Sequence, residues 1–588
     1  MPTHMWNRRR DGVAGPVADE QVADEQVADE QEQGVAVLPE LAYVVDALSW
    51  ERVHLRLTLA PDASAGGTET SGLEFVLRAG RRDLPIPATP LPAGGYELHA
   101  NVTTFAGRRQ IPDGTWQIVP RTADGEGPPA RLRLDRVETL EQDSRTFLYD
   151  GNRTAYVVEI AITEDDYDPR FLLRTYQLFR RTKRPAKSRN PLIRVEKRVA
   201  SRKNKVRAAQ GLLRATELSP IPDRPRILFA SEMRPALEGN LLAVRDRMVA
   251  RGLDKHVELD YSFRMPGSTD KARTAQLLWQ LGQADVVLID DYFPMLESIK
   301  LKPTTRVIQL WHAGSGFKSI GFSRFGKYGS PKLQNAHRHY TYAIAGSTHL
   351  VGVYAEAFGI EESAVIPTGL PRIDTFLDPG TIATTRTQFS AAHPELVGKK
   401  LILFAPTFRG RGFRDAHYPF EQLDFARLYD VLGEDTVFAV RMHHFVNERA
   451  PIPPQFADRI IDLTGVGITN DLLHVTDLLI TDYSSIIYEY SLLRRPMLFY
   501  AYDKDNYAAT RGFHRSFDEV APGRVVTTFN DLLEALHSTD FEEWKVEAFL
   551  KENFDHTDCG SSDRVIDQLV LSHPRISAHL RSGEQTDD

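Results

Sequence analysis

Two histidines follow apolar runs that are typical of buried strands. His312 follows residues 305–310, and His443 lies in the run over residues 437–444. A lone histidine is more often a packed structural residue than a catalytic one, because imidazole side chains are commonly half-buried and hydrogen-bonded. Two histidines at strand ends are better placed for chemistry. A neutral imidazole can take a proton from an attacking hydroxyl near neutral pH.

Basic side chains lie at the same predicted strand ends. Lys318 follows His312, and Arg409 follows the strand predicted over residues 401–406. Arg441 shares a strand face with His443, because side chains alternate along a strand. Such cations can hold phosphate oxygens, so the set predicts phosphoryl chemistry. The glycine-containing stretch WHAGSGFK matches neither dinucleotide nor P-loop spacing. Further loop or acceptor-side candidates are Gly314, Ser315, Gly316, Arg372 and Asp374.

A strand, turn, helix and strand are predicted between Asp471 and Tyr507. The strand at 478–481 stops at Asp482, and Ser484 and Ser485 follow. In a parallel sheet, ligands lie off the carboxyl ends of the strands. Either serine could cap the next helix, whose first N–H groups would face an anion. The alternative is an ordinary capped helix in an α/β domain.

These loops need two α/β domains to position them. Strands are predicted at 226–230, 285–291, 305–310 and 342–346, and then at 401–406, 437–444, 478–481, 497–500 and 525–529. The segments between them have helical character. This alternation predicts a GT-B type pair of Rossmann-like domains facing across a cleft. The predicted acceptor domain spans residues 223–395, and the predicted donor domain spans residues 396–588.

Three different segments precede this pair. Residues 17–31 read VADEQ three times, so residues 1–34 are predicted to form a disordered acidic tail. Residues 35–166 alternate apolar and polar side chains between Gly and Pro clusters, which predicts an antiparallel β-sandwich. Residues 167–222 are interpreted as a basic helical linker. Its cationic part, residues 180–207, suits an anionic membrane surface. Nucleic acid is less favoured because no aromatic residues interleave the charges. A solvated linker is the plainer alternative.

Composition sets outer limits on the function. The chain has 588 residues and a net charge of −8, with one cysteine, Cys559. One cysteine excludes an intramolecular disulfide and a cysteine-based zinc cage. No apolar run approaches the roughly 20 residues needed to span a bilayer, and no secretory signal is expected at the start.

Several motifs together resemble the CDP-glycerol glycerophosphotransferase family, the teichoic acid primases and polymerases. They are QLWHAGSGFKSIGFS, AEAFGI, PTGLPRID, ILFAPTFRG, VRMHH, ITDYSSIIYEYSLLRRPMLFYAYDKDNY and RGF, in this order across about residues 226–540. The resemblance implies a GT-B fold, a CDP-activated donor and peripheral attachment to the inner face of the cell membrane. It implies that His312 and His443 are the functional pair, that donor phosphate binds at the paired serines and that Glu489 meets the ribose hydroxyls.

We therefore expect transfer of glycerol phosphate or ribitol phosphate from its CDP ester to a lipid-linked or polymer hydroxyl, releasing CMP. His312 would be the general base, and His443 with Arg409 would hold the donor pyrophosphate. Asp482, Arg441 and Lys318 are assigned to the donor side. No metal or cofactor is expected. Two alternatives remain: a metal-independent glycosyltransferase using a UDP- or GDP-sugar, and a non-catalytic protein that binds an anionic polymer or nucleic acid.

Overall fold

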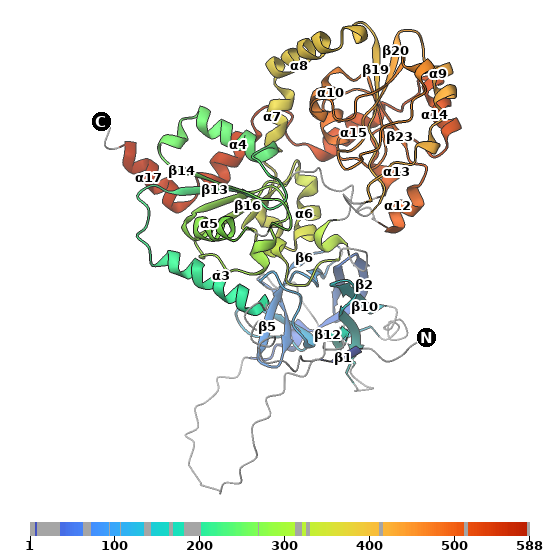
Figure 1. Cartoon of the computed structure of the whole chain (residues 1–588). Coiled ribbons are helices and arrows are strands. Elements are labelled where there is room, and N and C mark those ends of the chain that lie inside the picture. The colour runs from blue at the N-terminus through green and yellow to red at the C-terminus, as the bar shows by residue number, and fades with distance from the viewer. Residues whose placement is uncertain are drawn as a thin grey trace, which may run out of the picture. The chain divides into compact units, whose positions relative to one another are not determined.

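The computed structural model describes thirteen stretches of the chain: residues 6–8, 36–62, 72–92, 94–105, 107–133, 143–163, 169–180, 202–268, 270–311, 320–324, 330–410, 415–510 and 516–584. The chain divides into two compact units. The first contains residues 1–186 and 324–334, and the second contains residues 187–323 and 335–588 (Figure 1).

The first unit is a β-sandwich. One sheet has the order β10-β11-β12-β8-β4-β5, with β1 beside β12, and the other has the order β6-β7-β3-β2-β9. Rings from both sheets meet in the core, where Phe75 lies 5.3 Å from Tyr43 and 5.2 Å from Tyr96. The strands are β1 (Trp6–Arg8), β2 (Tyr43–Glu51), β3 (His54–Pro61), β4 (Glu74–Ala79), β5 (Arg82–Ile86), β6 (Ala88–Pro90), β7 (Tyr96–Asn101), β8 (Gly114–Arg121), β9 (Arg131–Leu132), β10 (Arg145–Tyr149), β11 (Thr154–Ile162) and β12 (Phe171–Arg180).

The sandwich differs from the sequence prediction at its edges. Strand β12 extends it past residue 166 to Arg180, and Trp6–Arg8, predicted to lie in the tail, pairs with β12. The β2–β9 pair is parallel in an otherwise antiparallel arrangement. A later segment also joins this unit, because the Ser330 hydroxyl donates to Leu148 O at 3.0 Å and Asp150 N donates to Pro331 O at 3.0 Å. The rest of the predicted tail and residues 181–201 of the basic segment lie outside the described residues.

The first half of the second unit is built on a parallel six-stranded sheet. The strand order is β14-β13-β15-β16-β17-β18. Its strands are β13 (Arg226–Ser231), β14 (Glu258–Phe263), β15 (Val286–Ile289), β16 (Arg306–Gln309), β17 (Tyr342–Ile344) and β18 (Val365–Ile366). The helices of this half are α3 (Arg202–Glu217), α4 (Gly239–Ala250), α5 (Lys271–Gln283) and α6 (Val351–Phe358).

The second half repeats the plan with the strand order β21-β20-β19-β22-β23-β24. Its strands are β19 (Lys400–Phe404), β20 (Thr436–Val440), β21 (Ile460–Asp462), β22 (Leu478–Thr481), β23 (Met497–Tyr500) and β24 (Arg524–Val526). The helices are α7 (Pro371–Leu377), α8 (Pro379–Ala392), α9 (Phe425–Val431), α10 (Thr469–Val475), α11 (Ile487–Ser491), α12 (Lys504–Thr510), α13 (Phe517–Val520) and α14 (Phe529–Ser538). The order reverses between β19 and β22, which is the switch point where such sheets bind ligands.

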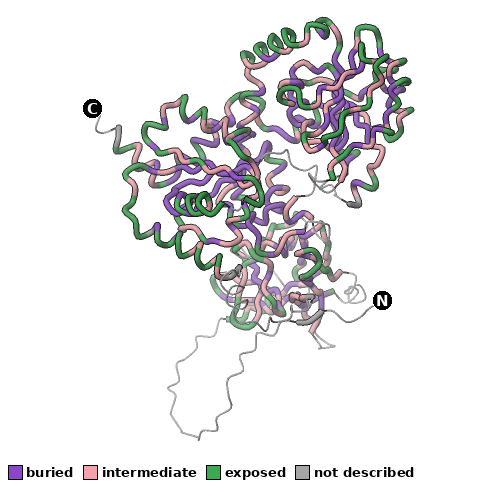
Figure 2. Tube along the Cα trace, viewed as in Figure 1, coloured by how far each residue is buried: buried purple, intermediate pink, exposed green. Residues whose placement is uncertain are grey.

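Helices cover the faces of both sheets, so the central strands are largely buried. Every residue of β15 and β22 is buried, as expected for parallel strands with no solvent face. Figure 2 shows these strands as buried and much of the outer helix surface as exposed. The last helices, α15 (Trp544–Asn553), α16 (Ser561–Val565) and α17 (Pro574–Glu584), return to the first half, where Arg247 Nε donates to Asp563 at 2.9 Å. Among the described helices, none combines the length and apolarity needed to cross a membrane.

Candidate functional site

A cavity of about 420 Å³ lies at the carboxyl ends of β19, β20 and β22, at the switch point of the second sheet. This volume falls in the range of small-ligand sites. None of its described lining residues is acidic, and several are basic or imidazole side chains. The lining residues are Ala405, Pro406, Arg441, Met442, His443, His444, Val446, Asn447, Arg449, Thr464, Gly465, Thr469, Ser484 and Ile486. The cavity therefore suits an anion.

The histidine predicted to hold donor phosphate, His443, lines this cavity with a fixed tautomer. The backbone N–H of Phe445 donates to His443 Nδ1 at 3.2 Å. In a neutral ring, Nδ1 is then the acceptor and Nε2 carries the proton. The ring stacks on His444 with centroids 4.2 Å apart and lies 4.9 Å from the Phe408 ring. These contacts fix the imidazole plane, and in this tautomer Nε2–H is the hydrogen-bond donor of the ring.

The neighbouring side chains set the charge of the cavity. Burial lowers the pKa of His444, although Glu238 opposes this shift, so His444 is neutral near pH 7. Arg441 Nη1 donates to Leu463 O at 2.7 Å, and Nη2 donates to Gly467 O at 2.9 Å. Arg441 thereby holds the loop after β21 and keeps its positive charge at the cavity wall.

Of the paired serines, Ser484 lines the cavity, but the predicted helix cap is wrong. Helix α11 has only five residues, its N-cap is Ile486, and no side chain makes a capping hydrogen bond. The Ser484 hydroxyl lies 3.5 Å from Ile486 N and also lines the cavity. Ser485 is half-buried one residue later. Because α11 is so short, Ser484 and Ser485 offer hydroxyl groups rather than the end of a long helix dipole.

Asp482 and Arg409, both predicted to contact the donor, bind each other instead. Asp482 is buried, and its Oδ1 accepts from Thr407 N at 2.7 Å while its Oδ2 accepts from Arg409 Nη1 at 2.9 Å. Arg409 also donates to both oxygens of Asp503, at 2.7 and 2.8 Å. Burial disfavours the charge of Arg409, but the two carboxylates raise its pKa above the ordinary value.

Four aromatic rings enclose the same guanidinium. Arg409 lies 5.2–6.0 Å from the ring centroids of Tyr418, Tyr483, Tyr502 and Tyr507. Cation–π attraction adds to the two ion pairs at these distances. The hydrogen bonds of Arg409 fix the strand-end loops that carry the cavity wall, and its contact with the donor pyrophosphate stays a prediction.

Glu489 was assigned to the ribose hydroxyls, and the structure pairs it with Arg372. The two side chains form an ion pair, and the Glu489 side chain is only 4% exposed. Arg372 belongs to the PTGLPRID motif at the start of α7, and its backbone N–H donates to Asn240 Oδ1 at 2.9 Å. The ion pair thus joins the start of α7 to α11. A ribose contact would require Glu489 to share or exchange this partner.

Asp374, assigned to the acceptor-side loops, caps α16. Its carboxylate accepts from Ser561 N at 2.9 Å and from Ser562 N at 2.7 Å. Gly369, in the same motif, has φ +82°, and a Cβ there would lie 2.5 Å from Ser561 Oγ. The PTGLPRID motif therefore ties the sequence-distant α16 to α7, which explains its glycine and its aspartate without a ligand.

The first predicted catalytic loop cannot be placed. His312, Gly314, Ser315, Gly316 and Lys318 lie outside the described residues. The residue before them, Trp311, is buried with φ +37°, a strained conformation for a large side chain. Strain of this kind tends to persist at functional sites, where the surrounding contacts enforce it.

Asn240, which the sequence did not single out, supplies some of those contacts. It is buried at the start of α4, and its amide donates to Leu310 O at 2.9 Å and to Trp311 O at 2.5 Å. Its Oδ1 accepts from Arg372 N. Asn240 therefore holds the backbone leading into His312 and the start of α7 in one place. A buried amide at a helix start carries no pattern that would identify it in a single sequence.

Asp290 is a second residue that the sequence did not identify. It follows β15, beside β13, where the order of the first sheet reverses. Its carboxylate is 1% exposed and lies 3.4 Å from Arg234 Nε. Burial raises the pKa of Asp290 to about 6. A carboxyl group that titrates near neutrality at a switch point is a functional candidate on physical grounds.

Within the described parts of the chain, no group of three or more His, Cys, Asp or Glu side chains is arranged to hold a metal ion. Residues 312–319 lie outside that search, so the expectation of a metal-free reaction stays a prediction.

Comparisons with known proteins agree with the motif resemblance. The family model described as CDP-Glycerol:Poly(glycerophosphate) glycerophosphotransferase matches residues 214–571. The teichoic acid ribitol-phosphate polymerase TarK of Staphylococcus aureus is 39% identical over 365 residues, which cover 61% of this chain and 71% of that protein. The teichoic acid poly(ribitol-phosphate) polymerase of Bacillus spizizenii is 37% identical over 351 residues, covering 59% of this chain and 56% of that protein.

A solved structure shares the fold. The structure of the wall teichoic acid polymerase TagF aligns with a TM-score of 0.51 at 22% identity, covering 66% of this chain and 97% of that one. At 22% sequence identity, this similarity concerns the fold alone. The two proteins therefore share a fold over that part of the chain.

Proposed function

Because the chain belongs to the CDP-glycerol:poly(glycerophosphate) glycerophosphotransferase family, we propose that it transfers a polyol phosphate from its CDP ester to an acceptor hydroxyl and releases CMP. The acceptor would be a polyol phosphate chain or its lipid-linked primer, in the synthesis of a teichoic-acid-like cell wall polymer. The two parallel sheets of the second unit fit a GT-B architecture for this reaction.

The observation that carries the proposal is the acid-free cavity at the switch point of the second sheet. A CDP ester brings two phosphate groups, and preorganised donors and cations stabilise charge that develops on their oxygens. His443 offers Nε2–H, Arg441 offers a positive charge, and Ser484 offers a hydroxyl from the neighbouring strand end. The Arg409–Asp482 ion pair would stabilise the strand-end loops that form this wall.

The bonds change as follows. The acceptor oxygen attacks the phosphorus that carries the polyol, and a new phosphodiester bond forms. The bond from that phosphorus to the bridging oxygen breaks, and CMP leaves with the electron pair. The proton of the acceptor hydroxyl goes to a base, which we assign to His312 from the motif resemblance. Asn240 positions the backbone immediately before that residue.

Ribitol phosphate is the favoured donor group. Both relatives compared above, at 37–39% identity, are named as ribitol-phosphate polymerases. The chain covers only part of each relative, so the choice of polyol remains a proposal for this protein.

The test is CMP release from CDP-ribitol and CDP-glycerol, each with a matching polyol phosphate acceptor. We expect turnover with at least one donor, faster with CDP-ribitol, and none with UDP- or GDP-sugars. His443→Ala should reduce turnover about 100-fold, because one donor at the developing charge is lost. The matched control is His417→Ala, since His417 is exposed in the same half and its ring contacts only Asp415 O at 3.0 Å among the described residues. Absence of CMP release with both donors from folded protein would contradict the proposal.

We also propose that residues 180–207 attach the protein to the inner face of the cell membrane. The segment is strongly basic, and each basic side chain near an anionic surface contributes about 1 kcal/mol. Its last residues begin α3, whose Leu213 is buried in the core of the first half, so a deletion there would disturb folding. The test is therefore replacement of the Lys and Arg residues at 181–198 by Gln. Flotation with phosphatidylglycerol vesicles should be lost, and retention of flotation would contradict this attachment.

A further inference from the structure

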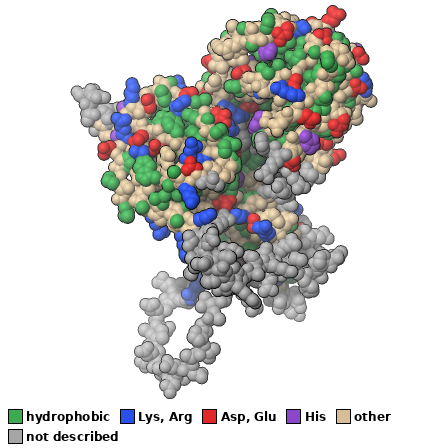
Figure 3. Space-filling model, viewed as in Figure 1, with side chains coloured by type: hydrophobic (Ala, Val, Ile, Leu, Met, Phe, Trp, Pro, Cys, Tyr) green, Lys and Arg blue, Asp and Glu red, His purple; other side chains and the backbone are tan. Residues whose placement is uncertain are grey.

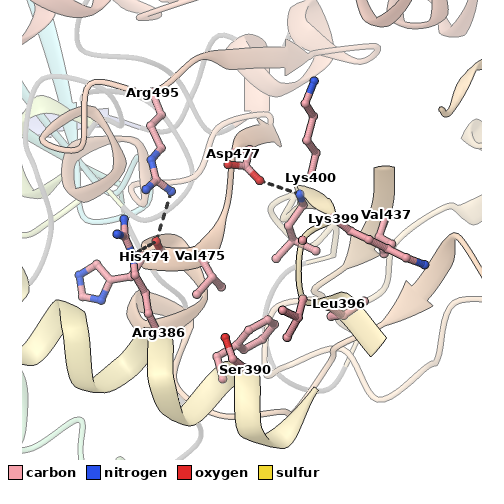
Figure 4. A pocket seen from close by; sticks show the side chains of 14 residues that line it. Arg386, Ser390, Leu396, Lys399, Lys400, Val437, His474, Val475, Asp477 and Arg495 are labelled. Carbon is pink, nitrogen blue, oxygen red and sulfur yellow. Dashed lines mark hydrogen bonds between the residues drawn. The ribbon is translucent and has the colours of Figure 1, made fainter. Parts of the chain in front are cut away.

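A second cavity of about 420 Å³ lies at the opposite end of the strands that carry the proposed donor site. Its wall comes from α8, the start of β19, the end of α10 and the residue two positions before β23 (Figure 4). Residues Lys400 to Phe404 of β19 separate the two cavities. At about 3.3 Å per residue, this is roughly 13 Å of strand. A ligand in the second cavity would therefore not contact the donor site.

Basic side chains are concentrated around this cavity. Its lining includes four cations and a single carboxylate, that of Asp477. Asp477 Oδ2 accepts from Leu401 N at 2.8 Å, so the acid already has a backbone partner. On the face of the molecule in Figure 3, side chains of both charge signs are interspersed. The four cations are Arg386, Lys399, Lys400 and Arg495.

Two of these cations are held in place by the end of α10. Arg386 Nε donates to His474 O at 3.3 Å, and Arg495 Nη1 donates to the same oxygen at 3.2 Å (Figure 4). Arg495 also donates to Thr476 O. These bonds use one nitrogen of each guanidinium, and the other nitrogens meet no hydrogen-bond acceptor within the described chain. Fixed guanidinium groups with remaining N–H donors are well suited to a phosphate.

The cavity also has apolar and hydrogen-bond-accepting parts. Phe389, Leu396 and Val437 line it beside the cations. His474 lines it too, and burial lowers the pKa of its imidazole. Because His474 Nε2 lies 2.9 Å from Phe376 O, the neutral ring carries its proton on Nε2, and Nδ1 is a buried acceptor without a partner in the described residues. A ligand with an anion and a short carbon stem would suit the cations and the apolar wall of this cavity.

We propose that this cavity is a second anion site, which binds a phosphate ester carried on a polyol. The site itself follows from the contacts above, and only the source of the ligand rests on the proposed function. If that function holds, the acceptor chain is a repeating polyol phosphate, and one of its units would be retained here while its end reacts elsewhere. A glycerophospholipid headgroup presents the same chemistry, so the experiment must separate the two sources.

A cysteine placed at the cavity gives a readout that does not depend on activity. The protein's one cysteine, Cys559, is exposed and is first replaced by Ser. Ser390→Cys then puts a thiol at the cavity wall, because Ser390 is exposed and lines it. Its alkylation rate by iodoacetamide is measured with and without 10 mM glycerol 3-phosphate, against sodium chloride of equal ionic strength. Ser538→Cys, exposed at the end of α14 and not part of the lining, is the matched control.

We expect glycerol 3-phosphate to slow alkylation at position 390 about tenfold, as for a site with a dissociation constant near 1 mM, and to leave position 538 unchanged. The double substitution Arg386→Gln and Lys400→Gln should abolish protection, and both side chains are exposed, so folding should persist. Protection by phosphatidylglycerol vesicles, but not by phosphatidylcholine vesicles or by glycerol 3-phosphate, would assign the site to a lipid headgroup. No protection by either probe, or equal protection in the charge-depleted variant, would overturn the site. CMP release, measured separately, reports on the proposed function alone.

Discussion

The ion pair between Glu489 and Arg372 provides the sharpest test of the site assignment. The motif resemblance gives Glu489 a ribose contact, whereas the structure gives it a buried ionic partner on α7. The Glu489 side chain is 4% exposed and the Arg372 side chain is 20% exposed. Glu489→Gln keeps the shape of the side chain and removes the carboxylate that pairs with Arg372. Removing one partner of a buried pair destabilises a protein by about 3–5 kcal/mol.

We expect a loss near the lower limit, about 3 kcal/mol, because Arg372 retains some contact with water and can still donate to the amide oxygen. With a denaturant dependence of about 3 kcal/mol per molar urea for a domain of this size, the unfolding midpoint should fall by about 1 M. The double variant Arg372→Gln and Glu489→Gln should recover much of the loss, since no uncompensated charge remains. Tryptophan fluorescence during urea titration measures all three proteins.

A matched control is the exposed pair of Arg494 and Glu547, whose side chains are 56% and 64% exposed at 2.7 Å. Glu547→Gln should change stability by less than about 1 kcal/mol, as surface pairs do. CDP binding by the Glu489→Gln variant is then measured by calorimetry in the absence of urea. Unchanged stability together with a weakened affinity for CDP would refute the structural assignment and restore Glu489 to the ribose.

Three other substitutions test separate parts of the argument. Asp482→Asn should lower the urea midpoint by about 1 M, because Arg409 loses a buried counter-charge; normal stability with weak CDP binding would instead support direct donor contact. Gly369→Ala should destabilise the protein by at least about 1 kcal/mol, because Gly369 has φ +82° and a Cβ would meet Ser561. Adding Ser561→Gly should recover part of this stability in a urea titration. Unchanged stability of the Gly369→Ala variant would show that the backbone can move. Asp290→Asn should stabilise the protein at pH 7.5, because burial raises the pKa of Asp290 from 3.8 to about 6. Ionisation of the buried Asp290 carboxyl lowers the free energy of unfolding. This loss is absent below about pH 3.8, grows as the pH rises to about 6, and then stays near 3 kcal/mol. If the difference in urea midpoint between variant and wild type does not grow over this pH range, the raised pKa of Asp290 is contradicted.

The pattern of buried strands was readable from the sequence because both sheets are covered on two faces. Such strands are continuous apolar runs bounded by polar loops, and nine of the twelve parallel strands match predicted runs. The three strands that were not predicted are β14, β18 and β21. All three lie at sheet edges, and β18 and β21 have only two and three residues. A short edge strand is fixed by pairing with its neighbour, which a single sequence does not display.

The site could be located from the sequence more easily than its contacts could be assigned. Strand-end position brought His443, Arg441 and Ser484 to one cavity, because neighbouring parallel strands end at the same edge. The same rule could not tell that Arg409 and Asp482 neutralise each other, since the direction of a side chain after a strand depends on the loop. Nor could it show that Asp374 caps a helix almost 190 residues later. Local pattern predicts where a charged residue emerges from the sheet, and only the tertiary partners decide whether its charge is used for a ligand or for the fold.

This distinction changes how the motifs of the second unit should be interpreted. The PTGLPRID motif was expected to supply an arginine and an aspartate on the acceptor side, yet each of these side chains has a partner within the fold. The cavity beside His443 shows the opposite arrangement. Arg441 donates its hydrogen bonds to loop carbonyls, so its charge stays at the cavity wall, and none of the described lining residues is acidic. An anion is attracted by charge that the protein has left uncompensated, not by the number of arginines in a motif. By that criterion the second, basic cavity at the other end of β19 is as strong a candidate for binding phosphate as the loops that the motifs first indicated.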